Sequence, residues 1–370
     1  MAFLHLLMPC TVDSLGNVHQ SPSQACFMSN RIVECVPNFS EGTNLEIIKR
    51  ISDSGRGIEG ARVLGIEPDS DYNRTVLTIA GEPEAVLESA FRVIKSASEN
   101  IDMKSHKGEH PRIGAVDVCP FIPLDGMTME DCVDLSNRLA KRVSEELGLC
   151  TFLYGAAATS PDRELLSDLR KGQYESLEER LGNGGPHLPD FGPMEWNERT
   201  ARFGAVVIGA RQILVAYNVN VDEEDAKTAK IAGSLVRSTG RLLKHEDGKR
   251  TRIPGMLPMV QGMGLPLESH GISQVSMNLR DVSVTPMHIA FEAVKSIVND
   301  HGVDTCGSEL VGLVPLSAML EAGRWYSSGD VVDENQLVEA AISGLGLDYL
   351  DSFNSNERII EWALASGVEA

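Results

Sequence analysis

The 370-residue sequence lacks several features that would restrict its function. No apolar run approaches the roughly 20 residues of a membrane-spanning helix, and the N-terminal segment has no basic region typical of a signal peptide. Basic residues are scarce, 33 against 53 acidic, and the net charge of −20 argues against long-range attraction to nucleic acid or anionic membranes. We therefore expect small-molecule partners, with no nucleic acid and no membrane.

Paired cysteines and common catalytic fingerprints are also lacking. The cysteines are odd in number, scattered, and without a C-x-x-C pair, which indicates a reduced, cytoplasmic protein: Cys10, Cys26, Cys35, Cys119, Cys132, Cys150 and Cys306. The glycine-rich stretches "GNGG" and "GLGL" match neither the dinucleotide nor the phosphate-loop pattern, and no G-x-S-x-G is present. Nucleotide binding and serine hydrolysis therefore have no support.

What the sequence does contain is one pattern of elements twice. From Arg31, apolar periodicity predicts strand, helix, strand, strand, helix and strand through "GAVDVCPFIPL", and the same order recurs from "ILVAYNVNV" to "ELVGLVPL". The repeat and the chain length predict an α+β fold with two tandem ferredoxin-like (β-α-β-β-α-β) sandwich subdomains, followed by C-terminal helices. A ligand would bind between the two halves.

The same patterns suggest how the chain divides. Residues 1–29 are expected to be a disordered extension or a misassigned start. An N-terminal subdomain is predicted at 30–190, a C-terminal subdomain at 191–328 and a helical segment at 329–370, with helices at 316–327 and 334–344. The stretch 161–193 is rich in charge, glycine and proline, and we interpret it as the linker.

The densest group of potential catalytic side chains is "HKGEHPR", residues 106–112. His106, Glu109 and His110 spell H-x-x-E-H, a zinc hydrolase pattern in which two histidines hold the metal and the glutamate activates water. That chemistry needs a helix, whereas Gly108 and Pro111 indicate a loop. We therefore expect no metal, and two interpretations stay open: ordinary surface histidines, or a proton-transfer loop.

A second charged stretch is "LLKHEDGKRTRIPG", residues 242–255, where basic side chains gather in an otherwise acidic protein. A solvated hairpin loop is the simpler interpretation. The alternative is a docking site for an acidic tail on a substrate.

Together, several stretches resemble one family, glutamate formimidoyltransferase, from about Arg31 to Trp362. They are "VECVPNFSEG", "NRTVLTIAG", "IDMKSHKGEHPRIGAVDVCPFIPL", "FLYGAA", "PDFGP", "GARQILVAYNVN", "QVSMNL", "GSELVGLVPL" and "NERIIEW". The resemblance implies transfer of the formimidoyl group of N-formimidoyl-L-glutamate to N5 of tetrahydrofolate with release of L-glutamate, in histidine degradation and one-carbon metabolism. It also implies a folate tunnel between two subdomains and a homodimer. Because the chain stops soon after "ERIIEW", we expect no fused cyclodeaminase, and a separate cyclodeaminase protein is a candidate partner.

The resemblance also implies roles for individual residues. The family's catalytic histidine falls on His110, which would take the proton of N5 and return it to the departing glutamate nitrogen. Because the transferred amidine is cationic, carboxylates should stabilise the tetrahedral intermediate, and the resemblance points to Glu67 and Glu309. Folate binding is expected at Gly192, Pro193, Gly204 and Trp196, with Asn38, Glu41 and Tyr154 lining the same space. A polyglutamate tail would be held by Lys249, Arg250 and Arg252.

Two departures from the family pattern leave alternatives open. Ala156 stands where a carboxylate is expected, and Glu67 is one methylene longer than the expected aspartate. One alternative is therefore a formyltransferase linked to N-formylglutamate or 5-formyltetrahydrofolate on the same scaffold. Another is a non-catalytic folate-binding protein.

Overall fold

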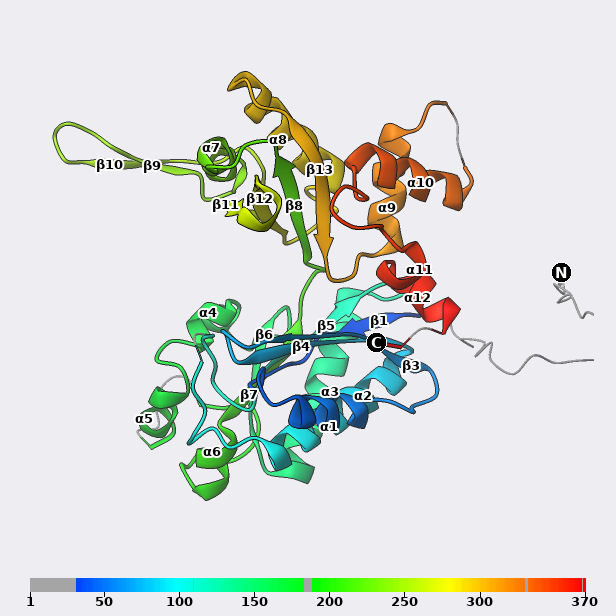
Figure 1. Cartoon of the computed structure of the whole chain (residues 1–370). Coiled ribbons are helices and arrows are strands. Elements are labelled where there is room, and N and C mark those ends of the chain that lie inside the picture. Colours follow the sequence, from blue (N-terminus) through cyan, green and yellow to red (C-terminus); the bar gives the residue numbers. More distant parts are fainter. Residues whose placement is uncertain (1–30, 109, 183–187, 330–331, 368) are drawn as a thin grey trace, which may run out of the picture.

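The computed structural model describes residues 31–108, 110–182, 188–329, 332–367 and 369–370. Our expectation for residues 1–29 lies outside this part of the chain. The described chain forms two mixed α/β halves in tandem, which are joined at a narrow waist in Figure 1. Within it, no helix is both long and apolar enough to cross a membrane.

The first half is a seven-stranded sheet whose three long helices lie against one face. β3 pairs with β4, β4 pairs with the short strands β1 and β2, these pair with β5, and β7 and β6 follow in parallel. The strands are β1 (Val33–Cys35), β2 (Asn38–Phe39), β3 (Ala61–Asp69), β4 (Arg74–Gly81), β5 (Val116–Pro123), β6 (Cys150–Gly155) and β7 (Ala205–Ala210). The helices are α1 (Leu45–Ser54), α2 (Pro83–Asn100) and α3 (Met129–Leu147).

Local sequence explains where these helices begin. The Asn44 side chain accepts hydrogen bonds from the first backbone N–H groups of α1, and Pro83 occupies the first turn of α2. Thr128 and Asp131 form a reciprocal capping box at α3. The apolar face of each helix packs on the sheet in one core that includes Phe39, Ile51 and Phe121.

The second half has a four-stranded antiparallel sheet in the order β11-β12-β8-β13. Its elements are β8 (Val215–Val221), α7 (Lys227–Val236), β9 (Arg241–Lys244), β10 (Arg250–Ile253), β11 (Val260–Leu267), β12 (Ile272–Leu279), α8 (Met287–Asp300) and β13 (Thr305–Val311). The register sets Asn218 of the central strand β8 opposite Glu309 of β13. The predicted helices at 316–327 and 334–344 are confirmed as α9 (Leu316–Tyr326) and α10 (Glu334–Leu345).

The predicted hairpin loop at 242–255 is confirmed as the ribbon β9–β10, which is inserted between α7 and β11. The chain ends in α11 (Ser355–Arg358) and α12 (Ile360–Ser366). Ile360, Ala363 and Leu364 of α12 pack against Leu64 and Ala80 of the first sheet. The last helix of the second half therefore also contacts the first half.

The interpretation of residues 161–193 as a linker is wrong. In the described residues this stretch contains η1 (Pro161–Arg163), α4 (Leu166–Leu169), η2 (Tyr174–Ser176) and α5 (Leu177–Gly182), and its leucines pack on the strands of the first sheet. Arg163 and Asp190 form an ion pair of 2.6 Å with both side chains 9% exposed. The charges that suggested a solvated linker are therefore partly neutralised inside the fold. Moreover, β7 belongs to the first sheet, so this half extends to Ala210 rather than to the expected residue 190.

Buried Glu34 of β1 leads to a prediction about stability. Burial raises the pKa of Glu34 to about 7, Glu361 adds to the rise, and Arg211 opposes it. Because the folded protein binds this proton more tightly than the unfolded chain, the stabilising contribution is complete below pH 4.5 and is lost as the pH rises through 7. We expect Glu34→Gln to flatten the pH dependence of the melting temperature between pH 5 and 8, and to raise the melting temperature at pH 8.

The measurement is thermal unfolding of both proteins across this pH range. Exposed Glu59 gives the matched control, since Glu59→Gln should leave the pH dependence as it is. An unchanged slope in Glu34→Gln would contradict the assignment.

Candidate active site

The segment "HKGEHPR" lies in the connection from α2 to β5. The described residues on both sides of Glu109 form no helix, so the predicted loop is confirmed there, and Glu109 itself lies outside the described residues. Backbone hydrogen bonds hold the ends of the connection, from Met103 N to Arg202 O at 2.8 Å and from Ala115 N to Phe203 O at 2.7 Å. The residues before β7 thus fix the loop that carries both histidines.

His106 has a supporting role in this loop. Its Nδ1 accepts a hydrogen bond from Arg112 Nε at 3.3 Å, so its Nε2 carries the proton and donates to Asn73 O at 3.1 Å. Arg112 in turn donates to both carboxylate oxygens of Glu175, at 2.7 and 3.0 Å. Burial lowers the pKa of His106, which is therefore neutral and fixed in one tautomer. Both of its ring nitrogens are occupied by the protein.

Of the two histidines in this loop, His110 is the one with a ring nitrogen that no described residue binds. Among the described residues, its buried Nε2 has no hydrogen-bond partner, and the side chain is 15% exposed. Burial and the guanidinium groups of Arg170, Arg74 and Arg112 lower the pKa of His110 to about 4, while Asp69 opposes them. The imidazole is therefore neutral at physiological pH and able to accept a proton.

Asp117 of β5 is the carboxylate beside His110. Its Oδ2 lies 3.8 Å from His110 Nε2, too far for a hydrogen bond, and its side chain is 1% exposed. Asp117 forms an ion pair with Arg170, which follows α4, and its Oδ1 accepts from Ile113 N at 3.0 Å. Burial raises the pKa of Asp117, and Arg170 opposes that rise. A nearby carboxylate would by itself raise the pKa of His110. Burial and the three guanidinium groups lower that pKa by more, so His110 stays neutral.

Arg74, the first residue of β4, completes the surroundings of His110. Its guanidinium lies 6.0 Å from the centre of the Tyr72 ring, which meets His110 edge-on at 6.3 Å. Arg74 Nη1 also donates to Asn38 Oδ1 at 3.3 Å. Burial lowers the pKa of Arg74, while nearby carboxylates that include Glu67 oppose this. Two predicted residues, Asn38 and Glu67, are therefore close to the His110 cluster.

The sequence reasoning missed Arg74, Asp117 and Arg170. For Asp117 a signal was available, because it is the only charged residue in the apolar run "GAVDVCPFIPL", and a buried charge needs a partner. Arg170 gave no such signal, since it lies 53 positions from Asp117 in a stretch that resembles a linker.

The two predicted catalytic carboxylates lie in different halves. Glu67, near the end of β3, is exposed and faces Gly312, where an added Cβ would lie 3.2 Å from its Oε1. Gly312 follows β13, so Glu67 lies where the first half meets a loop of the second. Glu309 Oε2 accepts from Asn218 Nδ2 of β8 at 3.1 Å and from Gln274 Nε2 of β12 at 3.0 Å, so two strands of the second half orient its carboxylate.

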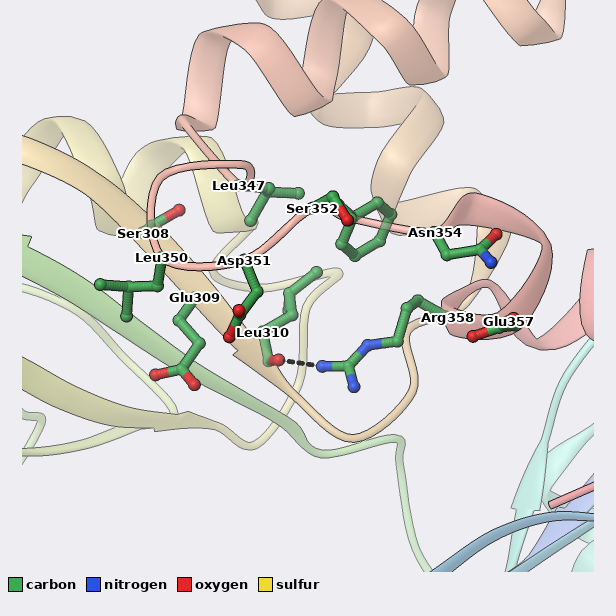
Figure 2. A pocket seen from close by; sticks show the side chains of 11 residues that line it. Ser308, Glu309, Leu310, Leu347, Leu350, Asp351, Ser352, Asn354, Glu357 and Arg358 are labelled. Carbon is green, nitrogen blue, oxygen red and sulfur yellow. Dashed lines mark hydrogen bonds between the residues drawn. The ribbon is translucent and has the colours of Figure 1, made fainter.

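Glu309 also borders a cavity of about 250 Å³ between β13 and the segment 347–358. Figure 2 shows Glu309 on the strand and Asp351 on the opposite segment, both lining the cavity, with Arg358 donating to the backbone oxygen of Leu310. The cavity is at the edge of the second sheet, and its lining residues all come from the second half.

The predicted folate-binding glycines have clear structural roles. Gly192 and Gly204 have φ values of 100° and 81°, a backbone conformation that favours glycine. A Cβ on Gly192 would lie 2.2 Å from Leu149 O, and one on Gly204 would lie 2.3 Å from Ile113 O. Pro193 O accepts a hydrogen bond from Cys150 Sγ at 3.0 Å. The close packing beside Ile113 brings Gly204 near the loop that carries His110.

The other predicted lining residues are engaged with the protein. Trp196 is half-buried and packs against Tyr174, with ring centres 5.9 Å apart. Glu41 Oε1 accepts from the backbone of Thr43 and Asn44, each at 2.9 Å, and so shapes the entry to α1. Burial raises the pKa of Tyr154 on β6 to about 12.

The structure does not bring the predicted tail-binding residues to the His110 cluster. Lys249, Arg250 and Arg252 are exposed on the hairpin β9–β10, which projects away from the second sheet in Figure 1. Arg252 Nη1 donates to Thr239 O at 2.9 Å. As for metals, the described residues contain no group of three or more His, Cys, Asp or Glu side chains that would hold an ion.

Comparison with known proteins adds a second line of evidence. Residues 32–211 match the family model for the N-terminal subdomain of the formiminotransferase domain, and residues 216–365 match that for the formiminotransferase domain. The glutamate formimidoyltransferase of Streptococcus pyogenes serotype M1 is 36% identical over 85% of this chain and 99% of the relative. The protein of the same name from Thermoplasma acidophilum is 38% identical over 83% of this chain and 96% of the relative.

A longer relative is the formimidoyltransferase-cyclodeaminase of Mus musculus, which is 41% identical over 90% of this chain. The chain spans 60% of the length of that relative.

Proposed function

The chain belongs to the formiminotransferase family, and on that premise we propose that it is a glutamate formimidoyltransferase. It would transfer the formimidoyl group of N-formimidoyl-L-glutamate to N5 of tetrahydrofolate and release L-glutamate. The observation that carries this proposal is the similarity over nearly the whole length of two relatives with that name. The neutral, unpartnered Nε2 of His110 supports it, because the reaction needs a base of this kind.

The proposed mechanism moves one proton between two nitrogens. N5 attacks the formimidoyl carbon, and a tetrahedral intermediate forms at that carbon. N5 gives up its proton to His110. The bond from that carbon to the glutamate nitrogen then breaks, and His110 returns the proton to this nitrogen. Nothing is oxidised or reduced, and tetrahydrofolate is consumed as a co-substrate.

The positive charge of the amidine calls for carboxylates in the same site, and we propose Glu67 and Glu309 for this role. The position of Glu67 at the meeting of the two halves supports its assignment. The hydrogen bonds from Asn218 and Gln274 support that of Glu309, because they hold its carboxylate in one orientation.

Finer features of the proposal concern the fold and the second substrate. We infer that each half contains a ferredoxin-like sandwich with folate bound between them, supported by the strand orders of the two sheets. The pterin would lie near Trp196, Tyr154, Asn38 and Glu41 and the segment from Gly192 through Pro193 to Gly204. The exposure of Lys249, Arg250 and Arg252 supports a role for these basic residues in binding the polyglutamate tail.

The compartment and the oligomeric state are also part of the proposal. Five cysteines in the described residues are free thiols, which supports a reducing compartment. We propose that the protein is a homodimer.

The test is a tetrahydrofolate-dependent assay of glutamate release from N-formimidoyl-L-glutamate. We expect turnover with this donor, and none when either substrate is omitted. Turnover with N-formyl-L-glutamate or 5-formyltetrahydrofolate instead would favour the formyltransferase alternative. Folate binding without turnover on any donor would indicate a non-catalytic binding protein, and activity lost to a chelator would restore the zinc interpretation of "HKGEHPR".

A further inference from the structure

Arg74 is the guanidinium of the His110 cluster that forms no ion pair within 4.0 Å in the described residues, although the charges of Asp69, Asp117 and Glu67 act on it from further away. Arg112 is bound by Glu175, and Arg170 is bound by Asp117. In the described part of the chain, by contrast, Arg74 has no ion-pair partner, and it makes a single side-chain hydrogen bond, at 3.3 Å, to neutral Asn38. A half-buried cation of this kind is costly unless an anion joins it.

Two side chains with unpartnered polar atoms, Arg74 and His110, lie beside the same Tyr72 ring. Arg74 Nε is buried and has no hydrogen-bond partner among the described residues, as is true of His110 Nε2. The Tyr72 ring contacts both side chains, with the guanidinium over its face and the imidazole at its edge. The N–H of Arg74 can donate a hydrogen bond and Nε2 of His110 can accept one. A ligand that offers both an acceptor and a donor would therefore fit beside the Tyr72 ring.

We propose that Arg74 binds the α-carboxylate of the glutamyl donor and thereby sets the departing nitrogen beside His110. This inference rests on the proposed function. The α-carboxylate and the reacting nitrogen are bonded to the same carbon atom, so fixing one restricts the other to a short arc. A guanidinium suits this role because its fork of N–H groups binds a carboxylate through two parallel hydrogen bonds.

Binding at Arg74 has an electrostatic consequence for His110. The charged groups that face the imidazole in the described residues are Arg170, Arg74, Arg112, Asp69 and Asp117. A bound carboxylate offsets the charge of Arg74, so the pKa of His110 rises towards its ordinary value when the donor binds. The imidazolium that forms during the attack is then better stabilised until it protonates the departing nitrogen. Donor binding and proton transfer are coupled through one side chain.

The first experiment measures binding of N-formyl-L-glutamate, a donor analogue in which an uncharged formyl group replaces the cationic formimidoyl group, by calorimetry without folate. We expect Arg74→Gln to weaken binding by about tenfold or more, and Arg74→Lys to weaken it less, because it keeps the charge but loses the fork. The matched control is Arg92→Gln, which removes an exposed guanidinium of α2 that pairs with Glu88 and should leave binding unchanged. Thermal unfolding of each variant separates lost binding from lost folding. Unchanged affinity in a folded Arg74→Gln would overturn the proposal.

The second experiment identifies the carboxylate. The α-amide of the analogue should bind the native protein weakly and with no further loss in Arg74→Gln, whereas the γ-amide should keep its dependence on Arg74. The reverse result would overturn the α assignment.

A third measurement follows His110 itself by NMR of labelled histidine. We expect its pKa to rise when N-formyl-L-glutamate binds, and to be raised already in Arg74→Gln without ligand. If the pKa of His110 changed neither on ligand binding nor in Arg74→Gln, the proposed coupling between donor binding and proton transfer would be contradicted. Since these readouts need no turnover, an inactive native protein that still binds the analogue through Arg74 would refute the proposed reaction and leave the carboxylate site standing.

Discussion

Replacement of His110 by alanine is expected to lower kcat/KM for formimidoyl transfer by about 10²- to 10⁴-fold, the usual contribution of a general acid–base group. The buried Nε2 of His110 has no partner in the described residues, so its removal breaks no hydrogen bond of that nitrogen. We therefore expect the melting temperature and the affinity for N-formyl-L-glutamate to change little. The measurement is steady-state transfer with both substrates varied.

Exposed His270 provides the matched control, since His270→Ala should retain the native rate. The pH profile sharpens the test. A neutral imidazole is required for the attack, and with a pKa of about 4 in the free protein, kcat/KM should stay level as the pH falls through 6.5 and decline only near 4. An acid limb at 6.5 or above, or a His110→Ala variant of native activity, would contradict the role of His110.

Replacement of Asp117 by alanine is expected to destabilise the fold by about 3–5 kcal/mol, the cost of removing one partner of a buried ion pair. The Asp117 side chain is 1% exposed and that of Arg170 is 17% exposed, so little water reaches the guanidinium that remains. The backbone N–H of Ile113 also loses its acceptor. Urea unfolding of the native protein and the variant measures the difference.

A double-mutant cycle separates the causes of this loss. Asp117→Ala combined with Arg170→Ala should be less destabilised than the sum of the two single variants, because no unpaired charge is left in the fold. The exposed pair of Lys49 and Asp53 is the control, and Asp53→Ala should cost no more than about 1 kcal/mol. If Asp117→Ala lowered the free energy of unfolding by no more than Asp53→Ala does, the buried ion pair would be as weak as the exposed one.

Much of the local structure was determined by the sequence alone. The repeated order of strands and helices follows from the spacing of apolar residues, which depends only on neighbours along the chain. Thr128 and Asp131 set the start of α3 because capping involves residues three positions apart. Gly108 and Pro111 predicted a loop rather than a zinc-binding helix, and the charged hairpin at 242–255 was predicted from its composition. The family resemblance then selected His110.

Other features were decided only by the tertiary structure. The stretch 161–193 resembles a linker in composition. In the folded protein, however, its leucines pack on the first sheet, and its Arg170 forms an ion pair with Asp117, which is 53 positions away in the sequence. That Arg74 forms no ion pair in the described residues, whereas Arg112 and Arg170 each form one, follows only from the folded positions of their side chains. The protonation state of His110 depends on burial and on three guanidinium groups from separate parts of the chain. The physical reason is that short-range periodicity and capping are written in neighbouring residues, whereas desolvation and Coulomb fields arise from groups that meet only after folding.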